Sequence, residues 1–179
     1  LILIGTSDGL FGFNPESNKV TSYSFHTSAI SSSYKEVRSI SSISQHEILI
    51  GYTDGEIGEF DIINNKIRSF ELMDEIQKYI NYNPVNCICR DDQNTYWIAT
   101  TNGLVKASAT TKQVRLFTED DGLPNSHIYG ILPDADKNLW MSTNNGISCY
   151  DVQEDYFRNY DVSDGLQNNE FNTGAFFKA

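Results

Sequence analysis

A short apolar run that ends in Asp-Gly or Asn-Gly recurs along the chain and organises it. The run occurs four times, over Leu3–Gly9, Leu49–Gly55, Trp97–Gly103 and Trp140–Gly146. The closing glycines are 43 to 48 residues apart. This period is too long for a single pair of strands and is typical of one four-stranded blade of a β-propeller.

The Asp-Gly and Asn-Gly pairs predict the hairpin between the second and third strands of each blade. These pairs supply the positive-φ positions of a two-residue type I′ turn. Apolar residues also recur at fixed distances on both sides of the glycine, which predicts first and fourth strands in constant register. Those positions include Val37, Val85 and Ile128 before it and Val20, Val114 and Phe157 after it. The second unit fits with one extra residue near Glu56-Ile57.

These patterns predict an all-β fold, a β-propeller segment of four-stranded antiparallel blades with about four blade repeats. We expect a partial blade over 1–26, complete blades over 35–71, 83–118 and 126–161, and the inner strand of a next blade over 169–179. The chain opens inside a strand, without an initiator Met or a signal peptide. We therefore expect it to be a piece of a longer protein with partial blades at both ends.

Two connections between blades depart from the repeat. Leu72, Ile76 and Ile80 recur at helical spacing, which predicts a short helix within Glu71–Tyr82. The serine-rich run Thr27–Ser33 takes the equivalent place one blade earlier, and we expect a surface loop there.

Composition narrows the range of partners. The 13 Lys and Arg against 24 Asp and Glu give a net charge of −11, which opposes binding to nucleic acid or to an anionic membrane surface. No run of about 20 apolar residues is present, so we expect no membrane contact by this segment. With 39% apolar and 12% aromatic residues, the chain can bury a substantial core.

Catalytic and metal-binding patterns are not evident in the sequence. The histidines His26, His46 and His127 fall at unrelated positions of the repeat. We interpret Cys87, Cys89 and Cys149 as buried small hydrophobes rather than disulfide, redox or metal-binding residues. We therefore predict that the segment is not an enzyme and that it needs no cofactor or metal.

Two further features have structural interpretations. The run Asp134–Asn138 has the alternating oxygen ligands of a calcium loop, but it lacks the later glycine and glutamate, so turn chemistry explains it better. Trp97 and Trp140 occupy positions where Leu3 and Leu49 stand in the other units. This exchange with leucine favours core packing over a sugar-stacking surface.

The connections between blades carry the best candidates for ligand contact. In a propeller these connections lie with the hairpins around one mouth of the central channel, where binding sites gather. We expect the repeated Asp-Gly-Leu at 121–123 and 164–166 to form tight turns whose leucine plugs between blades. The polar residues that follow are the candidate ligand-binding residues: Asn125, His127, Asn168, Asn169, Glu170 and Asn172.

The repeat resembles a known family. Asn138–Asp151, with its Leu-Trp-Met-Ser-Thr core and Tyr-Asp end, is similar to the two-component regulator propeller repeat. The closing Asp164–Ala175 resembles the entry to the last blade in the sensor region of Bacteroides-type hybrid two-component systems. Lys106-Ala107-Ser108, where the family usually has Tyr-Asp, departs from the pattern.

The resemblance implies a periplasmic sensor segment of an inner-membrane-anchored hybrid histidine kinase, with the kinase elsewhere in the protein. It implies an oligosaccharide ligand, control of glycan-utilisation genes, and further blades as partners. A protein-interaction propeller and a propeller-fold polysaccharide lyase are the alternatives. The exposed ends predict one of three arrangements: closure into a four-bladed ring, self-association, or an open arc. We favour the latter two over the four-bladed ring.

Overall fold

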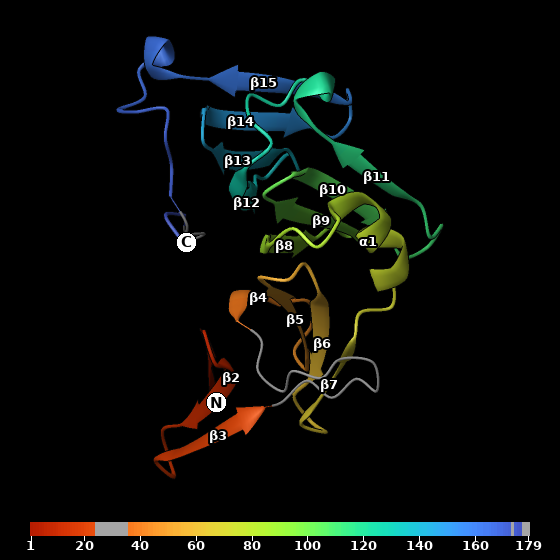
Figure 1. Cartoon of the computed structure of the whole chain (residues 1–179), viewed down its shortest axis with the longest axis vertical. Coiled ribbons are helices and arrows are strands. Elements are labelled where there is room, and N and C mark those ends of the chain that lie inside the picture. Colours follow the sequence, from red (N-terminus) through yellow and green to blue (C-terminus); the bar gives the residue numbers. More distant parts are fainter. Residues whose placement is uncertain (24–35, 173, 177–179) are drawn as a thin grey trace.

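The computed structural model describes residues 1–23, 36–172 and 174–176 as antiparallel sheets fanned along one arc (Figure 1). One sheet has three strands and three sheets have four, each in sequential order. The predicted all-β propeller architecture is therefore confirmed. The expected loop Thr27–Ser33 lies outside the described residues.

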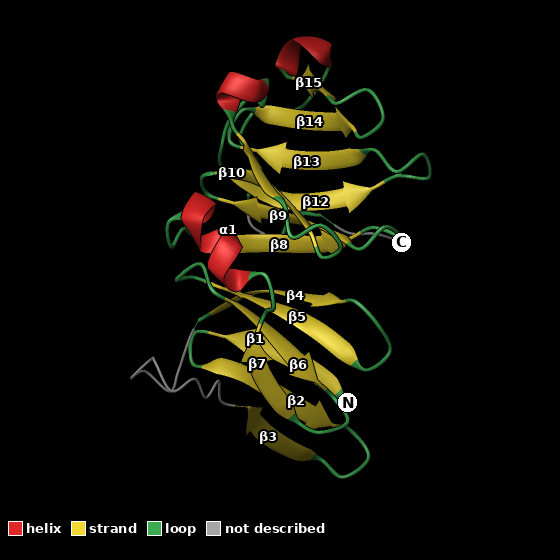
Figure 2. Cartoon of the chain, turned by 90° about the vertical axis from the view of Figure 1, so that its right-hand side faces the viewer, coloured by secondary structure: helices red, strands yellow, loops and turns green. Residues whose placement is uncertain are grey.

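The first two sheets contain the N-terminal repeats. The first consists of β1 (Ile2–Thr6), β2 (Gly9–Asn14) and β3 (Lys19–Tyr23). The second consists of β4 (Val37–Ser42), β5 (Glu47–Tyr52), β6 (Ile57–Asp61) and β7 (Lys66–Ser69). The helix α1 (Met73–Ile80) follows, as the spacing of Leu72, Ile76 and Ile80 predicts, and it packs against the third sheet (Figure 2).

The third and fourth sheets repeat the same order. The third consists of β8 (Val85–Arg90), β9 (Thr95–Thr100), β10 (Gly103–Ser108) and β11 (Val114–Phe117). The fourth consists of β12 (Ile128–Pro133), β13 (Leu139–Thr143), β14 (Gly146–Asp151) and β15 (Tyr156–Tyr160). Short 3₁₀ helices, η1 (Glu119–Asp121) and η2 (Val162–Asp164), follow the two outer strands.

The apolar cores lie between successive sheets rather than within them. One core joins Leu10 of the first sheet to Ile50 of the second, and the next joins Leu49 of the second to Ile98 of the third. The last core places Trp97 against residues of the fourth sheet. Each central sheet thus buries both faces, which explains why its second strand is apolar at consecutive positions instead of strictly alternating.

A small residue on the second strand lets the next blade approach closely. This position is occupied by Gly5, Gly51, Ala99 and Ser142. A Cβ atom built on Gly5 would lie 2.5 Å from Val37 Cγ1, and one built on Gly51 would lie 2.5 Å from Val85 Cγ1 and 2.8 Å from the Val85 carbonyl oxygen. Real Cβ atoms do not come so close, so β4 and β8 each lie in space that a side chain on the preceding second strand would fill.

The hairpins differ from the predicted turn type. In the third and fourth sheets φ is positive at Gly103 (+132°) and Gly146 (+92°) but not at the preceding Asn102 and Asn145. A type I′ turn requires positive φ at both central residues, so that prediction is wrong. A type I turn followed by a glycine bulge accounts for the observed φ values.

A threonine closes this turn. Thr100 Oγ1 donates to the carbonyl oxygen of Gly103 (2.9 Å) and accepts from the backbone N–H of Asn102 (3.0 Å). Thr6 and Thr143 make the same pair of bonds in their sheets. The second sheet has Tyr52 at this place, and there the turn is longer, with the Tyr52 N–H donating to the carbonyl of Glu56 at 3.0 Å.

The expected inner strand over 169–179 is not formed in the part of this segment that the structure describes. The segment instead makes two bonds to the fourth sheet, from Gly146 N–H to the Asn169 carbonyl (2.6 Å) and from Phe171 N–H to the Thr143 carbonyl (3.3 Å). In the other blades a first strand is held by the ladder to the second strand of its own blade. No such partner follows Phe171 among the described residues, so the backbone here stays irregular.

The turn assignment predicts a large cost for adding a side chain at Gly146. Its φ is +92°, and a new Cβ would lie 2.1 Å from the Tyr160 carbonyl oxygen. Gly146→Ala should therefore lower the free energy of unfolding by about 3 kcal/mol or more, from positive φ together with the clash. This loss can be measured by urea denaturation.

Gly165→Ala is the matched control. Gly165 also has a positive φ (+103°), but no atom lies within 4 Å of its added Cβ. In this variant the free energy of unfolding should fall only by the cost of a positive φ for alanine, about 1–2 kcal/mol. Equal losses in the two variants would contradict the proposed packing of the turn.

Candidate functional site

The first strands β4, β8 and β12 lie side by side on the inner side of the arc (Figure 1). Each has a register shift opposite its second strand, between Val37 and Ser39, Val85 and Cys87, and Ile128 and Gly130. The residue inside each shift is Arg38, Asn86 or Tyr129. A bulge turns a side chain out of the regular alternation of the strand and is frequent beside functional sites. Three equivalent bulges therefore present three different polar side chains to one region.

These side chains and His127 form a polar cluster, here called the inner-strand cluster, consisting of Arg38, Asn86, His127 and Tyr129. Asn86 is 4% exposed, and its Nδ2 donates to the carbonyl of Ile128 at 2.9 Å, which ties β8 to β12. The rings of His127 and Tyr129 have centroids 4.4 Å apart.

Arg38 belongs to the cluster because it lies at the bulge of β4, the strand beside β8. Burial lowers the pKa of His127 below its usual 6.5, and the positive charge of Arg38 lowers it further. His127 is therefore a neutral imidazole at pH 7. The ion pair of Arg38 is weak, because its Nη1 lies 3.8 Å from Glu36 Oε1, beyond hydrogen-bond distance.

The structure gives several of the predicted site residues local roles. Asn125 Oδ1 accepts from the backbone N–H of His127 at 2.9 Å, and Asn168 Oδ1 accepts from that of Asn169 at 2.7 Å. Asn169 Oδ1 accepts from the Val162 N–H at 2.9 Å. These amide oxygens thus help to fix the connections between blades.

The remaining predicted residues are split between two places. Glu170 and Asn172 are exposed on the irregular C-terminal segment. Of the six predicted residues, His127 belongs to the inner-strand cluster, together with Arg38, Asn86 and Tyr129. The prediction that ligand contact involves the six residues stays untested as a whole.

The Asp-Gly-Leu connections form tight turns, as predicted. Thr118 and Asp161 begin the two 3₁₀ helices with capping boxes, and Gly122 and Gly165 end them at positive φ. Leu123 is buried in the core between the third and fourth sheets. Leu166 is half-buried, because no further sheet follows it in the described chain.

The calcium-like run is explained by its turn. Asp134 Oδ1 accepts from the backbone N–H groups of Asp136 and Asn138, both at 2.9 Å, and Oδ2 accepts from Trp140 Nε1 at 2.9 Å. The equivalent Asp91 also caps its turn and accepts from Trp97 Nε1 at 3.3 Å. The carboxylates are thus engaged within the turns. Across the described residues, no group of three or more His, Cys, Asp or Glu is placed to hold a metal ion.

The cysteines differ in burial. Cys87 is buried, and its burial raises the pKa of the thiol. Cys89 and Cys149 are only partly buried, so the prediction of three buried cysteines is correct for one of them. No disulfide joins these three residues, all of which belong to the described ranges.

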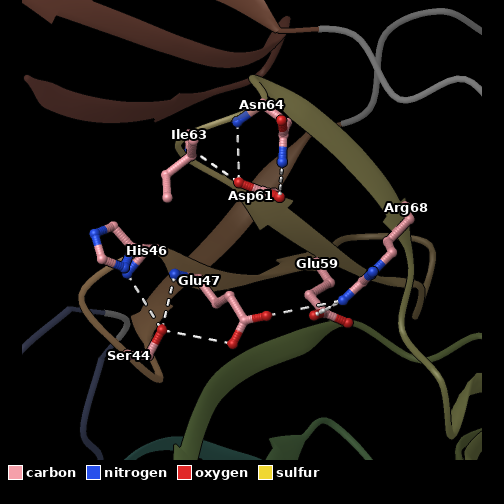
Figure 3. A network of polar contacts seen from close by, with 8 residues as sticks. All are labelled: Ser44, His46, Glu47, Glu59, Asp61, Ile63, Asn64 and Arg68. Carbon is pink, nitrogen blue, oxygen red and sulfur yellow. Dashed lines mark hydrogen bonds and ion pairs between the residues drawn. The ribbon is translucent and has the colours of Figure 1, made fainter.

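A polar network on the second sheet is a surface structure (Figure 3). Ser44 Oγ accepts from the backbone N–H groups of His46 and Glu47, at 3.2 and 3.0 Å. Arg68 binds Glu59 at 2.5 Å and approaches Glu47 at 3.8 Å. These contacts hold a turn and an outer strand. Arg68 therefore has a carboxylate within hydrogen-bond distance, whereas the carboxylate of Glu36 lies 3.8 Å from Arg38.

Several hollows open along the blades, among them the following two. One, of about 670 Å³, lies between α1, β10, β11 and β14, and its charged residues are largely paired, as in Arg115 with Asp155 at 3.0 Å. The other, of about 330 Å³, lies between the turns that contain Asp91 and Asp134. Trp97, which borders the second hollow, is 1% exposed, so it offers no surface for stacking a sugar.

The repeated sheets and their stacked cores define the class: this chain is a segment of a β-propeller. Two separate segments, 79–102 and 122–145, match the family model for the two component regulator propeller. The first contains β8 and β9, and the second contains β12 and β13. These two matches confirm the resemblance found in the sequence.

The chain is also similar to known proteins in part of its sequence and in its fold. The chain is 35% identical over 57 residues to histidine kinase P4 of Formosa agariphila, a stretch that covers 32% of this chain and 4% of that protein. Its fold is similar to the extracellular domain assigned to the hybrid two component system BT4673 of B. thetaiotaomicron, with a TM-score of 0.71 and 20% identity over 94% of this chain and 21% of that one.

A second solved structure has the same fold. The extracellular domain assigned to the hybrid two component system BT3049 of B. thetaiotaomicron matches with a TM-score of 0.62 and 22% identity, over 94% of this chain and 21% of that one. The chain therefore spans about a fifth of these structures. None of the helices in the described ranges has the length and apolar character needed to cross a membrane.

Proposed function

We propose that this chain is part of the extracytoplasmic, ligand-sensing propeller of a hybrid two-component histidine kinase. The observation that carries the proposal is the match of one segment in each of two consecutive blades to the two-component regulator propeller family. The shared fold with extracellular sensor domains supports a periplasmic location. Fold alone does not define a function, so the family match has more weight than the structural similarity.

The proposed role of the segment is binding, not catalysis. Catalysis needs a nucleophile with its base, converging carboxylates or a metal. The carboxylates that recur in this chain, Asp91 and Asp134, are engaged in turns and tryptophan contacts. The kinase chemistry belongs to other parts of the protein, and the ligand we propose is an oligosaccharide whose detection regulates glycan-utilisation genes.

Further blades are the proposed partners of both end faces. Ile2 and Ile4 on β1 are 52% and 44% exposed, whereas their equivalents Ile48 and Ile50 are 8% and 0% exposed against the preceding sheet. At the other end Trp140 is 38% exposed, and its equivalent Trp97 is 1% exposed. These faces have the composition of blade interfaces but no blade against them in the described chain.

The isolated chain should therefore self-associate through these faces, in preference to closing a four-bladed ring. Ile4→Asp should weaken association by placing a charge on the face of β1, as measured by light scattering over a range of concentrations. Val20→Asp is the control, because Val20 is 62% exposed on the outer strand β3. A compact monomer at all concentrations for the unmodified chain would contradict the proposal.

The sensing role predicts saccharide binding by the complete protein. Glycan-array screening followed by calorimetry should identify an oligosaccharide that binds with no turnover, and the complete protein should contain a membrane helix and kinase motifs. Reproducible cleavage of a polysaccharide, abolished by substitution of one Asp or Glu in this segment, would instead support a lyase. A complete protein without kinase motifs would favour a protein-interaction propeller.

A further inference from the structure

Three buried polar atoms without a hydrogen-bond partner meet in the inner-strand cluster. They are Nε of Arg38, Oδ1 of Asn86 and Nε2 of His127. Among the described residues, only one other buried side-chain oxygen or nitrogen lacks a partner, Oγ of Ser142 on the end face. Buried polar groups in proteins are nearly always paired, so three unpaired atoms from three consecutive blades at one place require an explanation.

The three side chains come from neighbouring first strands, with His127 directly before β12. Asn86 Nδ2 donates to the carbonyl of Ile128, the residue after His127. Arg38 lies at the bulge of β4, the strand that packs against β8, and its charge lowers the pKa of His127. Asn86 is 4% exposed, while Arg38 and His127 are half-buried.

The unpaired groups specify the chemistry of a partner. A guanidinium only donates hydrogen bonds and binds a carboxylate with two parallel bonds. An amide oxygen such as Asn86 Oδ1 only accepts, and it needs a hydroxyl or N–H donor. A neutral imidazole nitrogen pairs with a hydroxyl in either direction. A group that satisfies all three has both a carboxylate and neighbouring hydroxyls.

Neighbouring side chains in the described part of the protein leave donors of the Arg38 guanidinium free for a ligand. Glu36 is the carboxylate that faces Arg38, and its Oε1 lies 3.8 Å from Nη1. This distance leaves the donors of the guanidinium without a direct hydrogen bond to Glu36. Tyr129, whose ring lies against His127, directs its hydroxyl to Asn144 Oδ1 at 2.6 Å and takes no part in pairing Arg38.

We propose that the inner-strand cluster binds the acidic sugar of a saccharide, with the carboxylate on Arg38 and ring hydroxyls on Asn86 and His127. The inference rests on the proposed sensing function and adds the class of ligand and the residues that select it. Bulges in β4 and β8 bring Arg38 and Asn86 into position, so the site depends on side chains that differ between otherwise equivalent blades.

The test compares two matched sugars on the complete protein by isothermal titration calorimetry. Glucuronate should bind at least tenfold more tightly than glucose, which has the same ring without the carboxylate. Arg38→Gln should remove this preference by lowering the affinity for glucuronate at least tenfold. Arg68→Gln, which removes an arginine already paired with Glu59, should change neither affinity.

A second variant guards against an effect on folding. Arg38→Lys keeps the charge but not the two parallel donors, so it should retain a reduced preference for glucuronate. Equal affinity for glucuronate and glucose, or a preference that survives Arg38→Gln in a folded protein, would overturn the inference while leaving the sensing function intact. Failure of the complete protein to bind any saccharide would instead refute the sensing function, and the inference with it.

Discussion

Close packing of one blade on the next is the constraint on which this structure depends. A four-stranded sheet of this length has two apolar faces and cannot cover either by itself, so each core forms between neighbours. The approach is closest where the first strand of a blade lies over the small residue of the preceding second strand, as at Gly51 and Val85. Hydrogen bonds such as Ser39 Oγ to the Val85 carbonyl (3.2 Å) reinforce the same contact.

The same contact between blades determines where polar side chains can bind a ligand. Because the first strands are pressed together at the inner side of the arc, their bulges bring Arg38 and Asn86 from different blades into one cluster. The periphery has polar networks too, and there Arg68 and Glu59 form a close ion pair. Unpaired groups at the centre and paired groups at the rim are a physical reason to place ligand recognition at the inner strands.

Much of the fold could be predicted because the repeat has a local cause at each step. The Asp-Gly and Asn-Gly pairs marked the hairpins, and the spacing of Ile76 and Ile80 marked α1. The turn type was missed because a threonine two residues before the Asn-Gly asparagine, such as Thr100 before Asn102, engages the backbone and makes a bulge the better solution. Trp140 was expected in a core, but the blade that would cover it is not among the described residues.

The candidate site was harder to predict than the fold. A bulge leaves no mark in the sequence, so Arg38 and Asn86 look like ordinary strand residues. Asparagines after the Asp-Gly-Leu turns look available for ligand contact, but the side-chain oxygens of Asn125 and Asn168 accept hydrogen bonds from nearby backbone N–H groups. One signal could have found the cluster: Arg38, Asn86 and Tyr129 are polar or aromatic residues at the same repeat position, directly after Val37, Val85 and Ile128.

A double-mutant cycle at the contact between the second and third blades tests the central claim most directly. Gly51→Ala adds a Cβ against Val85 and should lower the free energy of unfolding by about 1–3 kcal/mol. Val85→Ala removes the γ-carbon at 2.5 Å, so the double variant should be more stable than the sum of the single effects by at least about 0.5 kcal/mol. Additive losses, or no loss for Gly51→Ala, would show that close blade packing does not control this fold.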